Sequence, residues 1–217
     1  VDEFNQTLNW AVRLVLIIAI PACIGLFILA APVLATLFQY GEFSASDTYL
    51  ASLSLMAYIA GLPAFILIKI LAPGFYARQD TKTPVRIGII AMVSNMALNI
   101  LFVVPLVIYN YEAPHVGLAL ATSCSAYLNA FMLYRGLRKI DVFRPVKGWA
   151  KLLIQITIAG IVMAFVISLV TPEQPQWSDW VIIERVSHIA GIIALAVLVY
   201  FVTLMLTGLR PAQLKRS

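Results

Sequence analysis

Six long apolar runs divide the 217-residue chain, and a short polar or charged segment separates each run from the next. The runs are Leu14–Phe38, Leu50–Phe75, Ile87–Ile108, Val116–Leu137, Leu152–Val170 and Val186–Leu206. A helix needs about 20 residues to cross a hydrocarbon core of about 30 Å, and barrel strands alternate over only about ten. The pattern therefore predicts an all-α fold, a polytopic membrane helix bundle with about six transmembrane helices.

Composition supports the membrane interpretation. The chain is 62% hydrophobic and 12% charged, whereas soluble domains are about 45–50% apolar and about 25% charged. Its net charge is +5, but the basic residues form short clusters between the apolar runs. Such clusters fix the orientation of membrane helices or meet anionic headgroups, so no nucleic-acid partner is expected.

The charged residues separate onto two sides if six helices are assumed. Thirteen of the fifteen basic residues then share one side: Arg13, Arg78, Lys82, Arg86, Arg135, Arg138, Lys139, Arg144, Lys147, Lys151, Arg210, Lys215 and Arg216. The other side has Arg185 and the acidic residues Glu42, Asp47, Glu112, Glu173, Asp179 and Glu184. Cytoplasmic loops carry the excess of Lys and Arg. We therefore expect a multi-pass inner-membrane protein with both ends in the cytoplasm.

The sequence contains no recognisable catalytic or metal-binding constellation. Cys23 and Cys124 lie alone inside apolar runs, and His115 and His188 are isolated near the outer ends. We expect no metal, no cofactor and no enzymatic activity. The chain begins with Val1 and shows no signal peptide, so we expect a piece of a longer protein.

A few polar residues inside the runs are candidates for binding a substrate. Lys69 is the one charge well inside a run, where a charge is costly and suggests function. Alternatively, its stem can snorkel to the cytoplasmic interface, because Pro73 and the end of the run are close. Asn95 and Asn99 share one helix face, and Asn129 shares another with Thr122 and Ser125, as the spacing of these residues shows. These faces can form hydrogen bonds between helices or line a wet cavity.

The loop between the second and third runs is the most distinctive segment. Thr81 or Thr83 is expected to cap the following helix, with Pro84 at an early helical position. Arg78, Asp80 and Lys82 are the candidate functional residues of this cytoplasmic loop, since Arg78 and Lys82 can meet phosphate groups.

This loop carries a family resemblance. It reads Leu-Ala-Pro-Gly-Phe-Tyr-Ala-Arg-Gln-Asp-Thr-Lys-Thr-Pro from Leu71 to Pro84, and an earlier segment reads Leu-Phe-Gln-Tyr-Gly-Glu-Phe from Leu37 to Phe43. Both resemble the MurJ (MviN) lipid II flippase family, within the multidrug/oligosaccharidyl-lipid/polysaccharide exporter superfamily. The resemblance covers essentially the whole chain.

The resemblance implies a part of a fourteen-helix transporter of the bacterial inner membrane. Residues 1–145 would be four helices of the second exporter lobe, and residues 146–217 the C-terminal pair, together helices nine to fourteen. The expected activity is alternating-access transfer of lipid II, an undecaprenyl-pyrophosphate glycopeptide, to the periplasmic leaflet for cell-wall synthesis. Expected partners are this lipid-linked substrate, membrane lipids and the missing N-terminal lobe. Lys69 would be a cavity residue, and the last two helices would form a groove for the lipid tail.

Two other functions stay open. A related exporter of drugs or of other polyprenyl-linked glycans has the same helix plan, although an ion-coupled drug exporter favours an acidic residue in mid-span, and no span here has one there. A non-transport membrane scaffold is the other alternative.

Overall fold

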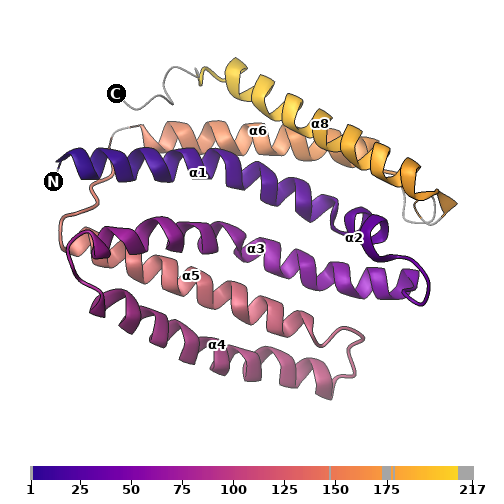
Figure 1. Cartoon of the computed structure of the whole chain (residues 1–217), viewed down its shortest axis with the longest axis horizontal. Helices are drawn as coiled ribbons and strands as arrows, with labels where there is room; N and C mark the ends of the chain where they lie inside the picture. The colour runs from indigo at the N-terminus through magenta and orange to yellow at the C-terminus, as the bar shows by residue number, and fades with distance from the viewer. Residues whose placement is uncertain (1, 147, 173–176, 178, 210–217) are drawn as a thin grey trace. The chain divides into compact units, whose positions relative to one another are not determined.

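The computed structural model describes residues 2–146, 148–172, 177 and 179–209, and all regular elements in this part are helices. They are α1 (Asp2–Ile28), α2 (Ala30–Phe38), α3 (Ala45–Tyr76), α4 (Lys82–Ile108), α5 (Val116–Lys139), α6 (Trp149–Val170) and α8 (Ile182–Leu206), as labelled in Figure 1. Five of the charged residues that predicted the orientation lie outside the described residues: Lys147, Glu173, Arg210, Lys215 and Arg216.

Six of these helices are long and apolar enough to cross a membrane: α1, α3, α4, α5, α6 and α8. Each is at least 22 residues long and contains an apolar window with at most two charged residues. The predicted count of six spans and the all-helical fold are confirmed. The chain is a multi-pass membrane protein.

The first span differs from its prediction at both ends. The apolar run Leu14–Phe38 predicted one helix, but α1 begins at Asp2 and the helix breaks at Leu29, after which α2 starts at Ala30. Pro32 explains the break, because proline has no N–H and is tolerated best in the first turn of a helix. Pro32 is the third residue of α2, so the break places it in that turn. The early start has another cause: backbone hydrogen bonds continue through polar residues, which a count of apolar positions leaves out.

The Cα positions of the described chain group into two compact units. The first contains residues 2–19 and 57–149, and the second contains residues 20–56 and 150–209. The divisions fall inside α1, inside α3 and after Trp149. These are groupings of contacts within the chain, so the predicted division into residues 1–145 and 146–217 stays a prediction. The two units are described separately below.

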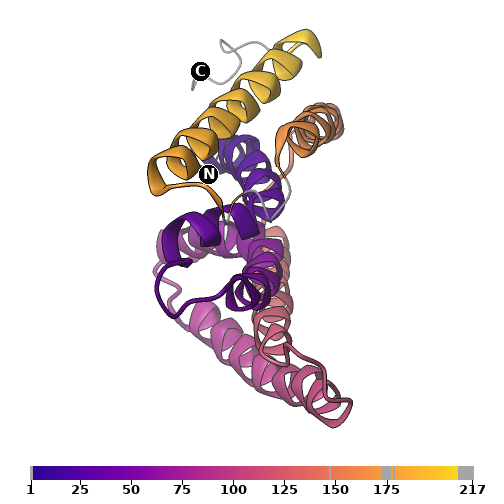
Figure 2. The same cartoon turned by 90° about the vertical axis from the view of Figure 1, so that its right-hand side faces the viewer.

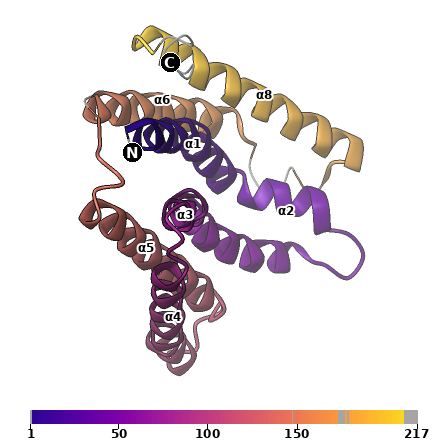
Figure 3. The same cartoon turned by 60° about the vertical axis from the view of Figure 1, so that its left-hand side comes forward.

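In the first unit, α3 and α5 run side by side in the same direction (Figure 3). Ser123 Oγ on α5 donates to the Ala57 carbonyl oxygen of α3 at 2.6 Å. Further along both helices, Phe75 of α3 lies where a side chain on Gly136 would have to go. Small residues such as the fully buried Ala64 allow this close approach, which is how helices commonly pack in membranes.

The apolar core of the first unit lies toward the α5–α6 linker. Its buried members are Leu8, Val12, Leu71, Phe75, Ile87, Leu133, Leu137, Val142 and Phe143. They come from α1, α3, α4, α5 and the start of the linker, so this core joins all the helical parts of the unit. Helix α4 packs along α5 (Figure 2), while much of its remaining surface is exposed and apolar, as lipid contact requires.

In the second unit, Arg185 near the start of α8 holds the end of α2. Its Nη1 donates to the carbonyl oxygens of Ala35 at 2.9 Å and Gln39 at 3.4 Å. Its Nε donates to the Trp180 carbonyl oxygen at 2.9 Å, and its Cζ lies 5.4 Å from the centre of the Tyr40 ring. The side chain is 6% exposed. The one basic residue assigned to the outer side is therefore buried and caps the last turn of α2.

Candidate functional site

The polar faces predicted on the third and fourth spans meet between α4 and α5. Asn95 Nδ2 lies 3.4 Å from both Thr122 Oγ1 and Ser125 Oγ. Asn99 Nδ2 donates to Asn95 Oδ1 at 3.2 Å. These four residues form a hydrogen-bonded stripe across the helix pair, as the i, i+4 spacing of Asn95 and Asn99 and the i, i+3 spacing of Thr122 and Ser125 predict. The geometry provides the interhelical bonds that were one of the two expectations.

One feature of this region fits the second expectation, a polar cavity wall. Asn99 Oδ1 is buried and has no hydrogen-bond partner among the described residues. An unpaired amide oxygen in an apolar setting is costly, so it is suited to accept a donor from outside these helices. Asn129 is partly buried on α5, but it is not part of the stripe. Its predicted role in binding stays a prediction.

Lys69 lies on a face of α3 that the first unit leaves uncovered. Lys69 is exposed, and so are Tyr58 and Tyr76 at helical spacing on the same face. In the described part of the chain, no carboxylate forms an ion pair with Lys69. The exposed ammonium is therefore available to a charged group outside these helices, and the exposure fits snorkelling equally well.

In the loop between α3 and α4, Asp80 and not a threonine caps α4. The Thr83 N–H donates to Asp80 Oδ1 at 3.0 Å, whereas Thr81 occupies the N-cap position without a side-chain hydrogen bond. The expectation that Thr81 or Thr83 provides the cap is wrong, because the carboxylate reaches the free N–H groups of the first turn. Hydrogen bonds from Thr83 lower the pKa of Asp80, and the nearby charge of Arg78 lowers it further. Pro84 lies in the first turn, as predicted.

The basic residues of this loop have different surroundings. Arg78 Nη1 lies 3.5 Å from the carbonyl oxygen of Ile140, just after α5, so it links the loop after α3 to the segment after α5. Lys82 begins α4 and is exposed, as is Arg86 one turn later. Arg78 therefore has a structural contact, while Lys82 and Arg86 form an open basic surface.

Two polar residues of α1, Asn5 and Asn9, form hydrogen bonds with the linker between α5 and α6. These contacts were not predicted from the sequence. Asn9 is 2% exposed, and its Nδ2 donates to the Arg144 carbonyl oxygen at 2.9 Å. Its Oδ1 accepts from Trp149 Nε1 at 3.0 Å and from the Val146 N–H at 3.3 Å. Asn5 Oδ1 accepts from the Arg144 N–H at 2.8 Å. The i, i+4 spacing of Asn5 and Asn9 was the available signal, but it could not name the partner.

Charged groups reinforce the same linker. The guanidinium of Arg144 pairs with Asp141, with Nε 2.6 Å from Oδ1. This contact lowers the pKa of the Asp141 carboxyl. On the α1 side, the Arg13 guanidinium carbon lies 5.2 Å from the centre of the Trp149 ring, a cation–π arrangement.

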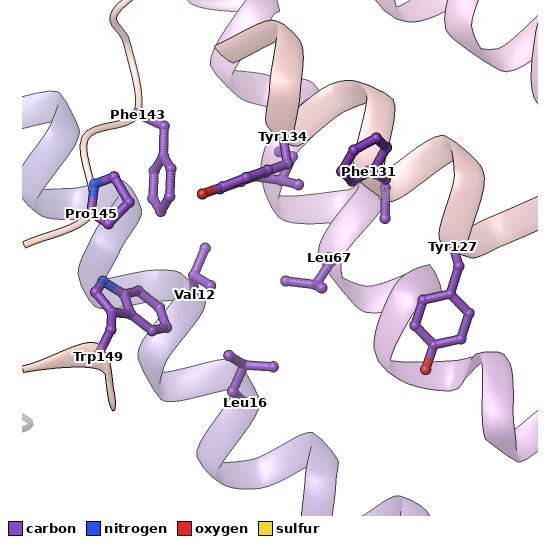
Figure 4. A pocket seen from close by; sticks show the side chains of 11 residues that line it. Val12, Leu16, Leu67, Tyr127, Phe131, Tyr134, Phe143, Pro145 and Trp149 are labelled. Carbon is purple, nitrogen blue, oxygen red and sulfur yellow. The ribbon is translucent and has the colours of Figure 1, made fainter. Parts of the chain in front are cut away.

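An apolar pocket of about 450 Å³ lies beside the linker, and we call it the linker pocket. Leu16 of α1 and Leu67 of α3 form part of its wall. The aromatic side chains of Phe131, Tyr134 and Trp149 surround the same space (Figure 4). Its walls are almost entirely apolar, so it suits a hydrocarbon rather than a polar ligand.

Comparison with known proteins identifies the family. The profile of the family described as "Lipid II flippase MurJ" matches residues 1–206. A protein of Haemophilus influenzae named "Probable lipid II flippase MurJ" is 46% identical over 98% of this chain. One of the same name from Vibrio cholerae is 45% identical over 100% of it, and "Lipid II flippase MurJ" of Burkholderia cenocepacia is 35% identical over 99%.

A solved structure agrees. "Lipid II flippase MurJ, inward closed conformation" aligns with 92% of this chain at a TM-score of 0.72 and 28% identity, covering 38% of that protein. The chain spans 40% of the length of each of the three relatives above. A match over residues 1–206, several relatives above 30% identity and a shared fold lead to one conclusion: the chain belongs to the MurJ family of lipid II flippases.

Proposed function

We propose that the chain is the C-terminal part of an inner-membrane flippase that moves lipid II from the cytoplasmic to the periplasmic leaflet by alternating access. The observation that carries this proposal is the 46% identity to the Haemophilus influenzae relative across 98% of the chain. The six membrane spans fit such a transporter, in which bundles move against each other around a central site. The activity belongs to the longer protein, of which the chain contributes helices and not covalent chemistry.

Orientation is part of the proposal. An even number of spans places both ends on one side, and the basic segments around Arg78, Arg138 and Arg144 belong to that side. The positive-inside rule then assigns this side to the cytoplasm.

Lys69 is the proposed contact for the substrate pyrophosphate. Support comes from its exposure on the uncovered face of α3 and from the rarity of charges within spans. An ammonium there offers a cation to the two phosphates when the site is open to the cytoplasm.

The last two spans are proposed to accommodate the polyprenyl tail. A pocket of about 330 Å³ in the second unit is lined by Val170 of α6 and by Ser187, His188, Gly191, Ile192 and Leu195 of α8. These mainly apolar residues suit an isoprenoid chain.

Complementation of a flippase-depleted strain tests the proposal with the full-length protein. We expect the wild type to restore growth and Lys69→Met to fail at normal membrane levels, because Met keeps much of the apolar stem but not the charge. Lys69→Arg should rescue partially, since charge survives while geometry and hydration change. Lys151→Met, at an exposed lysine near the start of α6, is the matched control and should rescue fully.

The outcomes distinguish the flippase assignment from the proposed role of Lys69. Failure of the wild type to restore growth, or to transfer lipid II in reconstituted vesicles, contradicts the flippase assignment. Full rescue by Lys69→Met removes Lys69 from the substrate path but leaves that assignment intact, and Asn95, Asn99 and Asn129 then become the next candidates.

A further inference from the structure

We propose that the linker pocket binds one acyl chain of an anionic membrane phospholipid, whose headgroup phosphate meets Arg13 and Arg138. This inference concerns a site separate from the lipid II path and does not rest on the proposed function. Four observations carry it: the lining, the charges at the rim, the depth of the pocket and the side of α3 on which it lies.

The residues that line the pocket favour a hydrocarbon ligand. The cavity of about 450 Å³ is bounded by aliphatic and aromatic side chains, among them Leu16, Leu67 and Phe131. A pocket of this size lies within the range of small-ligand sites, about 300–1,000 Å³. Few polar atoms are available inside to hold a polar or charged ligand, so a flexible apolar chain is the suitable occupant.

The positive charges at the edge of the pocket favour a negatively charged headgroup. Arg138 Nη1 lies 3.4 Å from the hydroxyl of Tyr134, and the Arg13 guanidinium stacks on the Trp149 ring. Tyr134 and Trp149 both line the pocket, so two guanidinium groups lie at its edge. Guanidinium groups bind phosphate through paired hydrogen bonds. This charge complementarity favours an anionic lipid over a zwitterionic one.

The depth matches a lipid in a single leaflet. Along α5, the pocket reaches from Tyr134 to Tyr127, seven residues or about 10 Å of helix. Tyr134 lies near the basic end of α5, which finishes at Lys139. Tyrosine and tryptophan gather where headgroups meet acyl chains. A lipid with its phosphate at Arg138 would therefore place its first methylenes beside Tyr134 and the later ones toward Tyr127.

The pocket lies on the side of α3 opposite Lys69. Leu67 and Leu71 line it, and each is two residues from Lys69. At about 100° per residue, two residues place side chains about 200° apart, on opposite sides of the helix. The linker pocket and the exposed Lys69 side chain therefore lie on opposite sides of α3.

Photo-labelling tests the proposal with the full-length protein in nanodiscs. The probe is a phosphatidylglycerol with a diazirine on one acyl chain, and mass spectrometry measures the adducts on the peptides that cover residues 127–149. We expect labelling there, its loss in Leu16→Trp, which fills the pocket, and about tenfold weaker apparent affinity in Arg138→Gln, which removes one charge-assisted contact. Val93→Trp and Arg86→Gln, both exposed on α4, are the matched controls and should label like the wild type.

Several results would overturn the proposal. Equal labelling by a diazirine phosphatidylcholine, or labelling unchanged by Arg138→Gln, contradicts an anionic ligand. Labelling that persists in Leu16→Trp places the lipid elsewhere. A photoreactive amino acid at Phe131 that cross-links to another protein segment, rather than to lipid, identifies protein as the occupant.

Discussion

Asn9 illustrates how one buried polar side chain can organise a membrane protein. Its amide oxygen and nitrogen bond to Arg144, Val146 and Trp149 across a separation of more than 130 residues. Asn9 itself is 2% exposed, so its amide is shielded from water and depends on these partners. Removing the amide therefore affects several partners at once.

We expect Asn9→Ala to lower the free energy of unfolding by about 1–3 kcal/mol, because it leaves buried donors and an acceptor without partners. The measurement is the thermal midpoint of the purified full-length protein in detergent. Gln6→Ala is the control, since Gln6 is exposed on the same helix. Equal losses in the two variants would show that helix propensity, not the linker contact, sets the effect.

At the scale of the elements, the close packing of α3 against α5 depends on the lack of a side chain at Gly61. A Cβ on Gly61 would lie 2.4 Å from Ser123 Oγ and 2.8 Å from Ser123 Cα. The second atom belongs to the backbone, so no rotamer change relieves the clash. The two helices must separate if Gly61 is enlarged.

Gly61→Ala should therefore destabilise the protein by about 1–3 kcal/mol through overpacking, even though alanine favours helix by about 1 kcal/mol. Gly88→Ala on α4 is the matched control, because a Cβ there meets nothing within 4 Å. We expect Gly88→Ala to keep or raise the thermal midpoint in detergent. A Gly61→Ala protein as stable as the Gly88→Ala protein would contradict the packing argument.

The number of spans was predictable because a run of about 20 apolar residues has one stable arrangement in a bilayer. The pairing of Asn95 with Thr122 and Ser125 was foreseeable from helical spacing on consecutive spans. The break at Leu29 was not predicted. A proline such as Pro32 does not by itself signal a break, because Pro21 and Pro63 lie inside helices that continue past them. The Asn9 contacts could not be predicted either, because spacing along one helix does not reveal a partner far away in the sequence. The roles of Lys69 and Asn129 in binding stay predictions.

For the whole molecule, charge and span number together predict the sidedness. The basic segments follow α3 and α5, while the acidic Glu42 and Glu112 lie in the loops before α3 and α5. Because successive spans alternate in direction, these two sets of loops lie on opposite sides of the membrane.

Cysteine labelling of the full-length protein checks this sidedness. The background carries Cys23→Ala and Cys124→Ala, since these are the free cysteines of the described chain. We expect cysteines introduced at Ser46 and Glu112 to react with an impermeant thiol reagent in intact spheroplasts. One introduced at Thr81 should react only after lysis; all three positions are exposed. Labelling of Thr81→Cys alone in intact cells would reverse the orientation.

Arg185 also has a consequence for how the protein is made. Its hydrogen bond to the Ala35 carbonyl oxygen joins residues 150 positions apart. A ribosome adding about 5–20 residues per second needs about 8–30 s to synthesise that stretch. During this interval the last turn of α2 lacks the guanidinium that caps it. The order in which these helices leave the ribosome is therefore not the order in which they are completed, and α2 becomes complete only when α8 arrives.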